Sequence, residues 1–476
     1  MRLPFADTVA RLERKLSGGT NTRARLDRYY EGRVRLASIG LSLPPEMRQM
    51  STVVNWPALY VDALEERLDV EGFRLDGAAD ADERLWEWWQ ANDLDEESQL
   101  AHLDALVYGR AFVTVGTAPE EGAPPVIRVE SARTMAADFD PYTRRVTAAL
   151  RVLAEDPEDE PHDRADAHPT APPYAARLYL PDRTVSLERV PRGGVWQVTG
   201  EDVHQLGRPL VEMLTNRGRA GERSGASEMR DVIGLTDAAC RTLTNMQGAQ
   251  ELLAVPQRYV LGARQEDFQD AHGQPIPAWE AYIGRFLMLA SEDAKAGQFP
   301  AADLRNFTEV MNLYAQLVAS VTGLPPHYLG QSTDNPASAD AIRSSEARLI
   351  KRAERKQRAF GGAWERVMRL AMLVEGMDPA RGTAMETDWR DAATPTVAAR
   401  ADAVTKLVAA GILPVEAAWE QLGYSPQYRA RLRSLTDTDP AVRYLAATDS
   451  SSGNTGPDDD SEDSDEDGDE DEEPAA

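Results

Sequence analysis

The feature that most restricts the possible folds is one very long helical pattern, from Pro336 to about Glu375. Asn335 can cap this helix, because the residue before a proline disfavours helical dihedral angles, and Pro336 suits the first helical position. At 1.5 Å per residue the helix would be about 60 Å long, which exceeds the usual range in globular domains. Such a helix suits an elongated subunit of an assembly. Gly361-Gly362 lies inside the pattern and predicts a kink.

The segment before this helix has an equally clear end. Ala302–Val321 carries an apolar stripe at helical spacing. Gly323 can then take the left-handed position that ends a helix, with Leu324 as its apolar partner, and Pro325-Pro326 prevents continuation. The sequence TGLPPHYLGQSTDNPASADAIRSSE (322–346) therefore joins two long helices through a loop of small polar residues and prolines.

The remaining patterns are mixed. Helical spacing recurs in 5–31, in 224–253 with Ser224 or Ser227 as N-cap, and in three short segments after residue 390. Between about 50 and 222, short helices are followed by period-2 strands and by a hairpin around Asp140-Pro141. The fold class is therefore α+β, mainly helical.

Charge is unevenly distributed along the 476 residues. The net charge is −27, and residues 449–476 hold 14 acidic and no basic residues, which leaves −13 for the rest. The low-complexity tail is expected to be disordered. The acidic body argues against tight DNA binding over a broad surface, because neutralising phosphates requires basic residues. The N-terminus lacks the apolar run of a signal peptide, and no segment is apolar for long enough to span a membrane.

We find no motif that indicates catalysis, a metal or a cofactor. No phosphate-binding loop, H-E-x-x-H or nucleophile elbow occurs, and the six histidines are scattered. The single cysteine, Cys240, falls on an apolar helix face and excludes an internal disulfide. Asp138 and Asp140 form a D-x-D pair, which a turn explains better than a metal site. The chain is expected not to be an enzyme.

One segment is unusually basic for this chain. Seven residues form this basic stripe, opposed only by Glu346 and Glu354: Arg343, Arg348, Lys351, Arg352, Arg355, Lys356 and Arg358. Such a stripe can lie near nucleic acid, form a solvated face, or pair with an acidic neighbouring subunit. The acidity of the chain favours the neighbouring subunit.

Six stretches follow one another in a distinctive order: YYEG (29–32), VNWPALYVDALEERLDVEGFRL (54–75), ALVYGRAFVTV (105–115), AACRTLTNMQGAQELLAVPQRYVLG (238–262), the 322–346 loop and GILPVEAAWEQLGYSP (411–426). Together they resemble the portal proteins of tailed bacteriophages, in particular the siphophage type. The resemblance covers nearly the whole chain except the acidic tail.

The resemblance implies a subunit with named parts. They are an N-terminal helical segment (1–49), a mixed α/β wing (50–222), a first stem helix (223–255), a clip (256–300), a second stem helix (301–322), a tunnel loop (323–338), a long wing-crossing helix (339–390), a helical crown (391–448) and the disordered acidic tail (449–476).

It also implies a function and partners. Portal subunits form a ring, typically a dodecamer, at one vertex of the phage head, and double-stranded DNA passes through it during packaging and ejection. The implied partners are the terminase large subunit, the major capsid and scaffolding proteins, and the head–tail adaptor. The protein would reside in the virion, and in the host cytoplasm during assembly, without membrane contact. The DNA-channel loop would contain Gln331, Ser332, Thr333, Asp334 and Asn335.

This loop suits a channel through which DNA slides. Gly330–Ser338 holds no basic residue and one acid, Asp334, so its contacts with phosphates would be weak and exchangeable. Alternatives are an ordinary surface loop and, for the whole chain, a minor head protein, an adaptor, an acidic-tailed chaperone, or a nuclease or protease without a recognisable motif.

Overall fold

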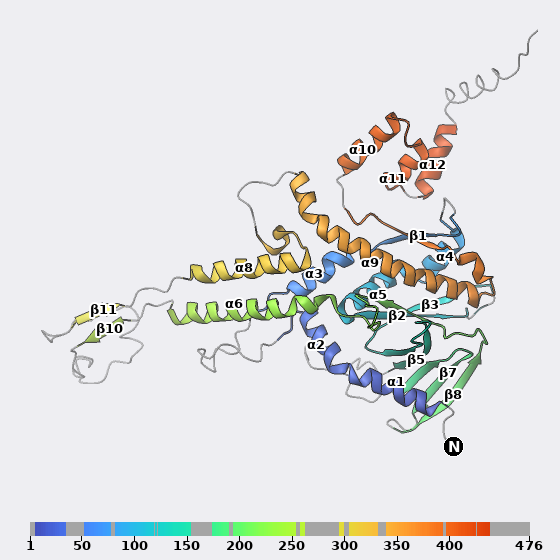
Figure 1. The fold of residues 1–476 in the computed structure, drawn as a ribbon, viewed down its shortest axis with the longest axis horizontal. Helices are drawn as coiled ribbons and strands as arrows, with labels where there is room; N and C mark the ends of the chain where they lie inside the picture. Colours follow the sequence, from blue (N-terminus) through green and yellow to red (C-terminus); the bar gives the residue numbers. More distant parts are fainter. Residues whose placement is uncertain are drawn as a thin grey trace, which may run out of the picture. The chain divides into compact units, whose positions relative to one another are not determined.

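The structure is a computed structural model. It describes residues 5–34, 52–77, 81–118, 120, 122–153, 174–189, 194–253, 258–261, 295–298, 304–331, 339–393, 397–424 and 426–437. The chain divides into two compact units, Met1–Ala393 and Thr394–Ala476. Helices and antiparallel sheets both contribute, so the α+β fold class predicted from the sequence is confirmed (Figure 1).

A five-stranded antiparallel sheet forms one part of the first unit. Its strands, in spatial order, are β4 (Met135–Phe139), β5 (Val146–Leu153), β6 (Ala175–Tyr179), β7 (Arg183–Arg189) and β8 (Trp196–Val203). Helix α1 (Ala6–Gly18) packs on this sheet through the buried side chains of Val9 and Leu12. At the β4–β5 turn the Asp140 carboxylate accepts the backbone N–H groups of Tyr142 and Thr143, which confirms the turn interpretation.

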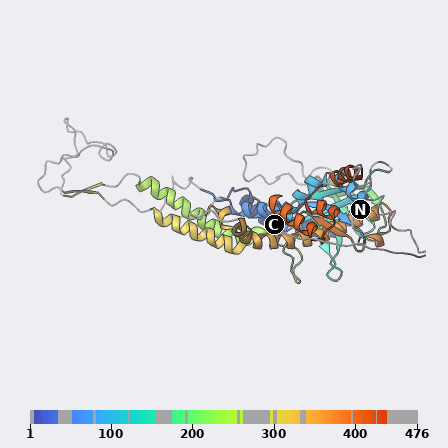
Figure 2. The same ribbon diagram turned by 90° about the horizontal axis from the view of Figure 1, so that it is seen from above.

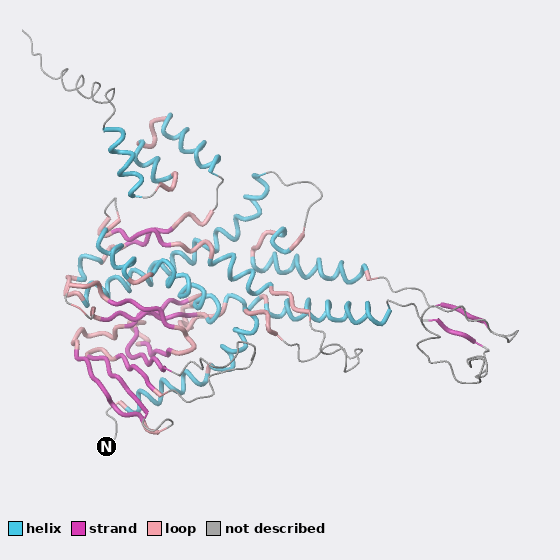
Figure 3. The backbone as a smooth tube through the Cα atoms, turned by 180° about the vertical axis from the view of Figure 1, so that it is seen from behind, coloured by secondary structure: helices cyan, strands magenta, loops and turns pink. Residues whose placement is uncertain are grey.

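A second sheet lies at the main core. It has the order β3 (Val126–Glu130), β2 (Arg110–Gly116) and β9 (Val211–Thr215), and Figure 3 shows its strands in magenta among the helices. The helices around this core are α2 (Thr20–Tyr30), α3 (Trp56–Glu65), α4 (Glu83–Ala91) and α5 (Leu94–Tyr108). The ring of Trp89 contacts those of Phe73 and Trp364, with centroids 5.4 Å and 5.0 Å away. Trp86 stacks on Trp89, so both tryptophans contribute to packing.

Two helices leave this core side by side (Figures 1 and 2). They are α6 (Ile233–Leu253), which follows the 3-10 turn η2 (Glu228–Asp231), and α8 (Arg305–Thr322). Ser227 caps η2 by accepting the N–H of Met229, so the regular helix begins later than the sequence pattern indicated. The strands β10 (Arg258–Leu261) and β11 (Lys295–Gln298) pair antiparallel.

Helix α9 (Ala339–Val374) is the long helix predicted from the sequence. It ends before residue 390, because Gly376 adopts a left-handed φ of +70° and the N–H of Met377 returns to the carbonyl of Met372. After the 3-10 turn η5 (Pro379–Gly382), the chain forms β12 (Glu386–Trp389). This strand pairs antiparallel with β1 (Val70–Arg74), a contact that the sequence patterns did not indicate.

Gly361 allows β12 to approach α9 closely. A Cβ at this position would lie 2.9 Å from Nε1 of Trp389, and the carbonyl of Gly361 accepts the hydroxyl of Thr387 at 3.2 Å. Next to Gly362 the nearest such atom belongs to the flexible end of Arg366, at 3.7 Å. Of the two glycines that predicted a kink, Gly361 therefore provides the space for the neighbouring strand β12.

The second unit contains three described helices, α10 (Val397–Ala409), α11 (Val415–Gln421) and α12 (Pro426–Asp437). Gly411 and Gly423 follow the first two with left-handed φ values of +67° and +83°. Arg433 of α12 pairs with Glu416 of α11 at 3.0 Å. The acidic tail, 449–476, lies outside the described residues.

Candidate functional site

A buried carboxylate connects the elements that hold the 322–346 loop. Glu228 is the first residue of η2, and its side chain is 2% exposed. The residues around it come from α3, from the end of β9 and from α9. We call this group the Glu228 cluster, and its members are Tyr60, Asn216, Arg217, Glu228, Arg352 and Lys356.

The carboxylate is satisfied on both oxygens. Oε2 lies 2.7 Å from Nζ of Lys356 and 2.9 Å from Nε of Arg217. Nδ2 of Asn216 donates to the same oxygen at 3.1 Å. Oε1 accepts the hydroxyl of Tyr60 at 2.8 Å, and Nη1 of Arg352 lies 3.9 Å away. A buried charge with this many partners avoids the cost of an unpaired ion.

The surroundings set the protonation states of the cluster. Burial by itself would raise the pKa of Glu228, but the charges of Lys356 and Arg217 and the hydrogen bonds outweigh it and lower the pKa to about 2. Burial and the neighbouring Glu228 raise the pKa of the Tyr60 hydroxyl. The cluster therefore holds an ionised carboxylate and a neutral tyrosine across the neutral pH range.

One row of cations on α9 faces the body of its own chain. Arg348, Arg352 and Lys356 follow at four-residue intervals, so they lie on one helix face. Nη1 of Arg348 donates to the carbonyl of Ser320, and Nη2 of Arg352 to that of Val321, both at 2.6 Å. These carbonyls belong to the last turn of α8, where a helix lacks internal partners and favours positive charge. The row thus fixes α9 to the end of α8 and the start of η2.

The other residues of the basic stripe lie differently. Lys351 and Arg358 are exposed and pair with Glu354 on their own helix, at 2.6 Å and 3.8 Å. Arg355 is exposed, and the side chain of Arg343 lies outside the described residues. The partners of Arg348, Arg352 and Lys356 thus lie within the chain, whereas the composition of the stripe indicated DNA, solvent or a neighbouring subunit. The four-residue spacing of Arg348, Arg352 and Lys356 indicates that they share one helix face, and this was the sequence signal for a common set of partners within the chain.

The described ends of the loop are both attached to the body. At the end of α8, Gly323 has a φ of +78°, and its N–H donates to Ala319. The 3-10 turn η4 (Pro326–Leu329) follows, and Nε2 of Gln331 donates to the carbonyl of Asn312 at 2.9 Å. On the far side, the hydroxyl of Tyr328 lies 3.3 Å from Oε1 of Glu346 in α9. The predicted channel residues Ser332, Thr333, Asp334 and Asn335 lie outside the described residues.

The histidine and cysteine side chains of the described residues are the first candidates for a metal or catalytic role. Among them, no group of three or more histidine, cysteine, aspartate or glutamate side chains could hold a metal ion. Cys240 is buried, and its Sγ accepts the N–H of Val54 at 3.3 Å. His102 is buried, its Nε2 accepts Nε1–H of Trp364 at 2.8 Å, and burial lowers its pKa to about 3. In the described part of the chain, no helix is sufficiently long and apolar to cross a membrane.

Comparison with known proteins identifies the class. The chain is 42% identical over 427 residues to the portal protein of Mycobacterium phage L5 and, equally, to that of Mycobacterium phage D29. Each alignment covers 87% of this chain and 85% of the relative. These two relatives confirm the resemblance to phage portal proteins that the order of the six stretches indicated.

The family follows from a second match. Residues 21–424 match the family described as "Phage portal protein, SPP1 Gp6-like", and the chain belongs to this family. This result selects the portal interpretation over a minor head protein, an adaptor or a chaperone.

Solved structures with a similar course of the chain come from gene transfer agent (GTA) particles. A chain of "Virion of native gene transfer agent (GTA) particle" is 14% identical, with a TM-score of 0.47, and the match covers 85% of this chain and 94% of the other. A chain of "Neck of empty GTA particle computed with C6 symmetry" is 15% identical, with a TM-score of 0.45 and coverages of 86% and 95%.

Proposed function

We propose that this portal protein assembles into a closed ring at one capsid vertex and that double-stranded DNA passes through the ring during packaging and ejection. The observation that carries the proposal is an apolar row on α8. Val310, Leu313, Leu317 and Val321 are exposed by 37%, 52%, 41% and 37%. Their spacing puts them on one face, whereas Ala315 and Val318 of the same helix are buried against the core of the chain.

A row of exposed apolar side chains on a helix is typical of a surface that another protein covers. The row lies on α8 to one side of its buried face, so another copy of the chain can cover it. Head-to-tail contacts of this kind close into rings when the rotation between subunits fits. The family of the chain supports this partner, since the ring is the form that the portal resemblance implies.

The parts of the chain then take the roles that the resemblance implies. The wing would be 50–222, the stem 223–255 and 301–322, the clip 256–300 and the crown 391–448, with 339–390 crossing the wing. We propose that the clip receives the terminase large subunit and later the head–tail adaptor, and that the capsid and scaffolding proteins surround the ring. The sequence has no phosphate-binding loop, so the terminase would supply the ATP-driven step.

The tunnel loop, 323–338, would line the channel through Gln331–Asn335. Its small polar side chains support weak, exchangeable contacts with passing phosphates. Lys351, Arg355 and Arg358 are exposed, and their one ion-pair partner among the described residues is Glu354 on the same helix. One carboxylate cannot balance three cations, so these side chains are available to an acidic neighbouring subunit.

The ring is tested by particle mass and by negative-stain images of the purified protein. Wild-type protein is expected to run far above 52.4 kDa and to show rings with a central hole. Replacing Leu313 and Leu317 with lysine should prevent assembly and leave a folded subunit. Gln316→Lys, an exposed position on the same helix, should still assemble. A wild-type monomer at every salt and protein concentration would refute the ring.

A further inference from the structure

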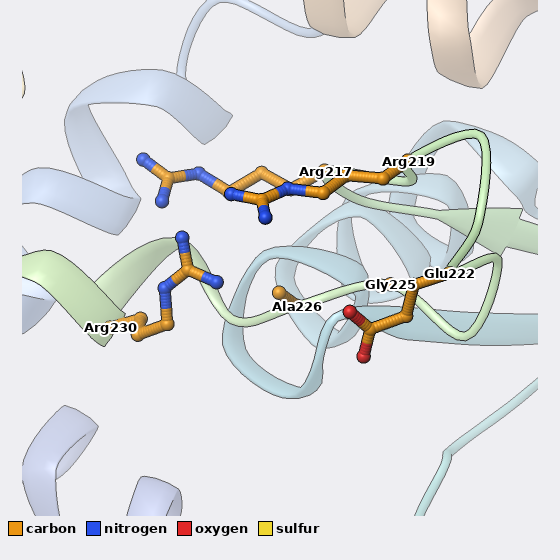
Figure 4. Close-up of a pocket in the computed structure, with 6 residues that line it drawn as sticks. All are labelled: Arg217, Arg219, Glu222, Gly225, Ala226 and Arg230. Atoms are coloured by element: carbon orange, nitrogen blue, oxygen red, sulfur yellow. The ribbon is translucent and has the colours of Figure 1, made fainter.

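A pocket beside the Glu228 cluster collects arginine side chains. Its volume is about 210 Å³, and Figure 4 shows its lining residues: Arg217, Arg219, Glu222, Gly225, Ala226 and Arg230. The guanidinium group of Arg230 points toward that of Arg217, and the carboxylate of Glu222 stands on the opposite side. The pocket lies at the loop between β9 and η2.

The frame of this pocket is braced. The N–H of Asn216 donates to Gly109, and the N–H of Ala226 donates back to the carbonyl of Asn216, at 2.9 Å and 3.0 Å. Gly225 has a φ of +76°, and a Cβ there would collide with the carbonyl of Gly109. Arg219 and Glu222 exchange backbone hydrogen bonds at 2.8 Å and 3.1 Å. The backbone that carries the arginines is thus preorganised, which lowers the entropic cost of binding a partner.

The positive charge of the pocket is only partly balanced. Arg217 uses Nε on Glu228 and Nη1 on Asp231, and Arg230 shares Asp231 through Nε at 3.3 Å. Glu228 also serves Lys356. Within the described ranges, no carboxylate pairs with the guanidinium of exposed Arg219. The pocket therefore retains planar guanidinium donors that fit a carboxylate or a phosphate.

DNA must slide through a portal ring, and this requirement favours a carboxylate over a DNA phosphate as the ligand of the pocket. A phosphate site of several arginines, repeated around a ring, would hold DNA tightly, whereas a conduit must let DNA slide. A carboxylate on a neighbouring subunit stays in place and gains from the same charge. The chain has a net charge of −27, so a second copy presents many carboxylates.

We propose that the arginine pocket receives carboxylate side chains of a second copy of this chain, as an ion-pair site between subunits of the ring. This inference rests on the proposed ring. It adds to the ring a polar contact, distinct from the apolar row on α8. Because the pair joins charges across an interface, assembly should weaken as salt screens it.

The experiment compares two charge reversals on the same loop. Arg219→Glu changes a side chain that lines the pocket, and Arg223→Glu makes the same charge change at an exposed residue outside the lining. The full-length protein is titrated for ring formation by mass photometry at low and high NaCl. Arg219→Glu should raise the concentration for half-assembly by about tenfold or more and reduce its salt dependence. Arg223→Glu should remain close to wild type, and circular dichroism should show both variants folded.

Each outcome decides the proposal. Equal shifts in the two variants would assign the effect to overall charge and overturn it. Normal rings of Arg219→Glu that have lost affinity for a short DNA duplex would assign the pocket to phosphate and also overturn it. Failure of the wild type to form rings would refute the proposed function itself, which the wild-type arm reveals separately.

Discussion

Nζ of Lys356 lies 2.7 Å from Oε2 of Glu228, and this contact joins the long helix α9 to the turn that precedes α6. The two residues are 128 positions apart in the chain. Glu228 is buried, so the ion pair and its hydrogen bonds fix one relative position of the two elements. The 322–346 loop leaves the end of α8, which the neighbouring Arg348 and Arg352 hold in turn.

Removing the buried charge should therefore destabilise the first unit strongly. Glu228→Gln leaves Lys356 and Arg217 without their shared counter-charge, and the free energy of unfolding should fall by about 3–5 kcal/mol. Glu354→Gln breaks an exposed pair with Lys351 and should cost at most about 1 kcal/mol. Urea denaturation followed by tryptophan fluorescence measures both, and equal losses would contradict the role given to the cluster.

Stability should also depend on acid through the same group. Folding lowers the pKa of Glu228 from 4.5 to about 2. A carboxyl with a lowered pKa stabilises the fold above its unfolded pKa, and this contribution is lost as the pH falls through 4.5 toward 2. The loss amounts to about 3 kcal/mol. Wild-type stability should thus fall more steeply than that of Glu228→Gln in this window, and parallel curves would contradict the assignment.

The two adjacent glycines of α9 should respond in opposite directions. Gly361→Ala places a Cβ 2.9 Å from Nε1 of Trp389 and should destabilise the α9–β12 contact by roughly 1–3 kcal/mol. Gly362→Ala meets no such neighbour and should stabilise the helix by up to about 1 kcal/mol. Thermal unfolding of the two single variants gives the comparison. A stabilised Gly361→Ala variant would show that the close approach has no energetic consequence.

The proposed channel loop can be tested by strengthening its contact with DNA. Thr333→Arg together with Asp334→Lys changes the charge of each subunit by +3. Rings should still form, because these substitutions leave the apolar row on α8, the proposed contact between subunits, unchanged. Packaged DNA length should change strongly, and more at low ionic strength, because phosphate attraction is screened by salt. The measurement is an in vitro packaging reaction with ring assembly followed in parallel. Normal packaging at every salt concentration would show that the loop does not touch DNA.

The ends of the helices could be predicted because their signals are local. Gly323 and Leu324 mark the end of α8 in the sequence, and the structure shows Gly323 in the left-handed conformation with Leu324 buried. Asp140 likewise forms its turn with residues two and three positions away. Such signals depend on a few neighbouring residues, so no tertiary information was needed to recognise them.

The contacts made by these elements could not be predicted in the same way. β12 pairs with β1, more than three hundred residues earlier, and its short sequence has no strong strand pattern. Arg348 and Arg352 were recognised as basic, but their partners are the backbone carbonyls of Ser320 and Val321. Every residue has a backbone carbonyl, so the sequence does not show which carbonyl an arginine will bind. A row of basic residues therefore has the same sequence pattern whether it faces DNA, another subunit or its own chain.

The sequence by itself determined the fold class, the long helix, the loop between two helices and the resemblance to portal proteins. Each of these follows from local periodicity, from caps and prolines, or from the order of recognisable stretches. The tertiary structure alone decided that Glu228 is the centre of a buried charge cluster and that the basic stripe divides into an inward and an outward row. The physical reason is that burial and ion pairing depend on which distant elements meet, and this is settled only when the whole core packs.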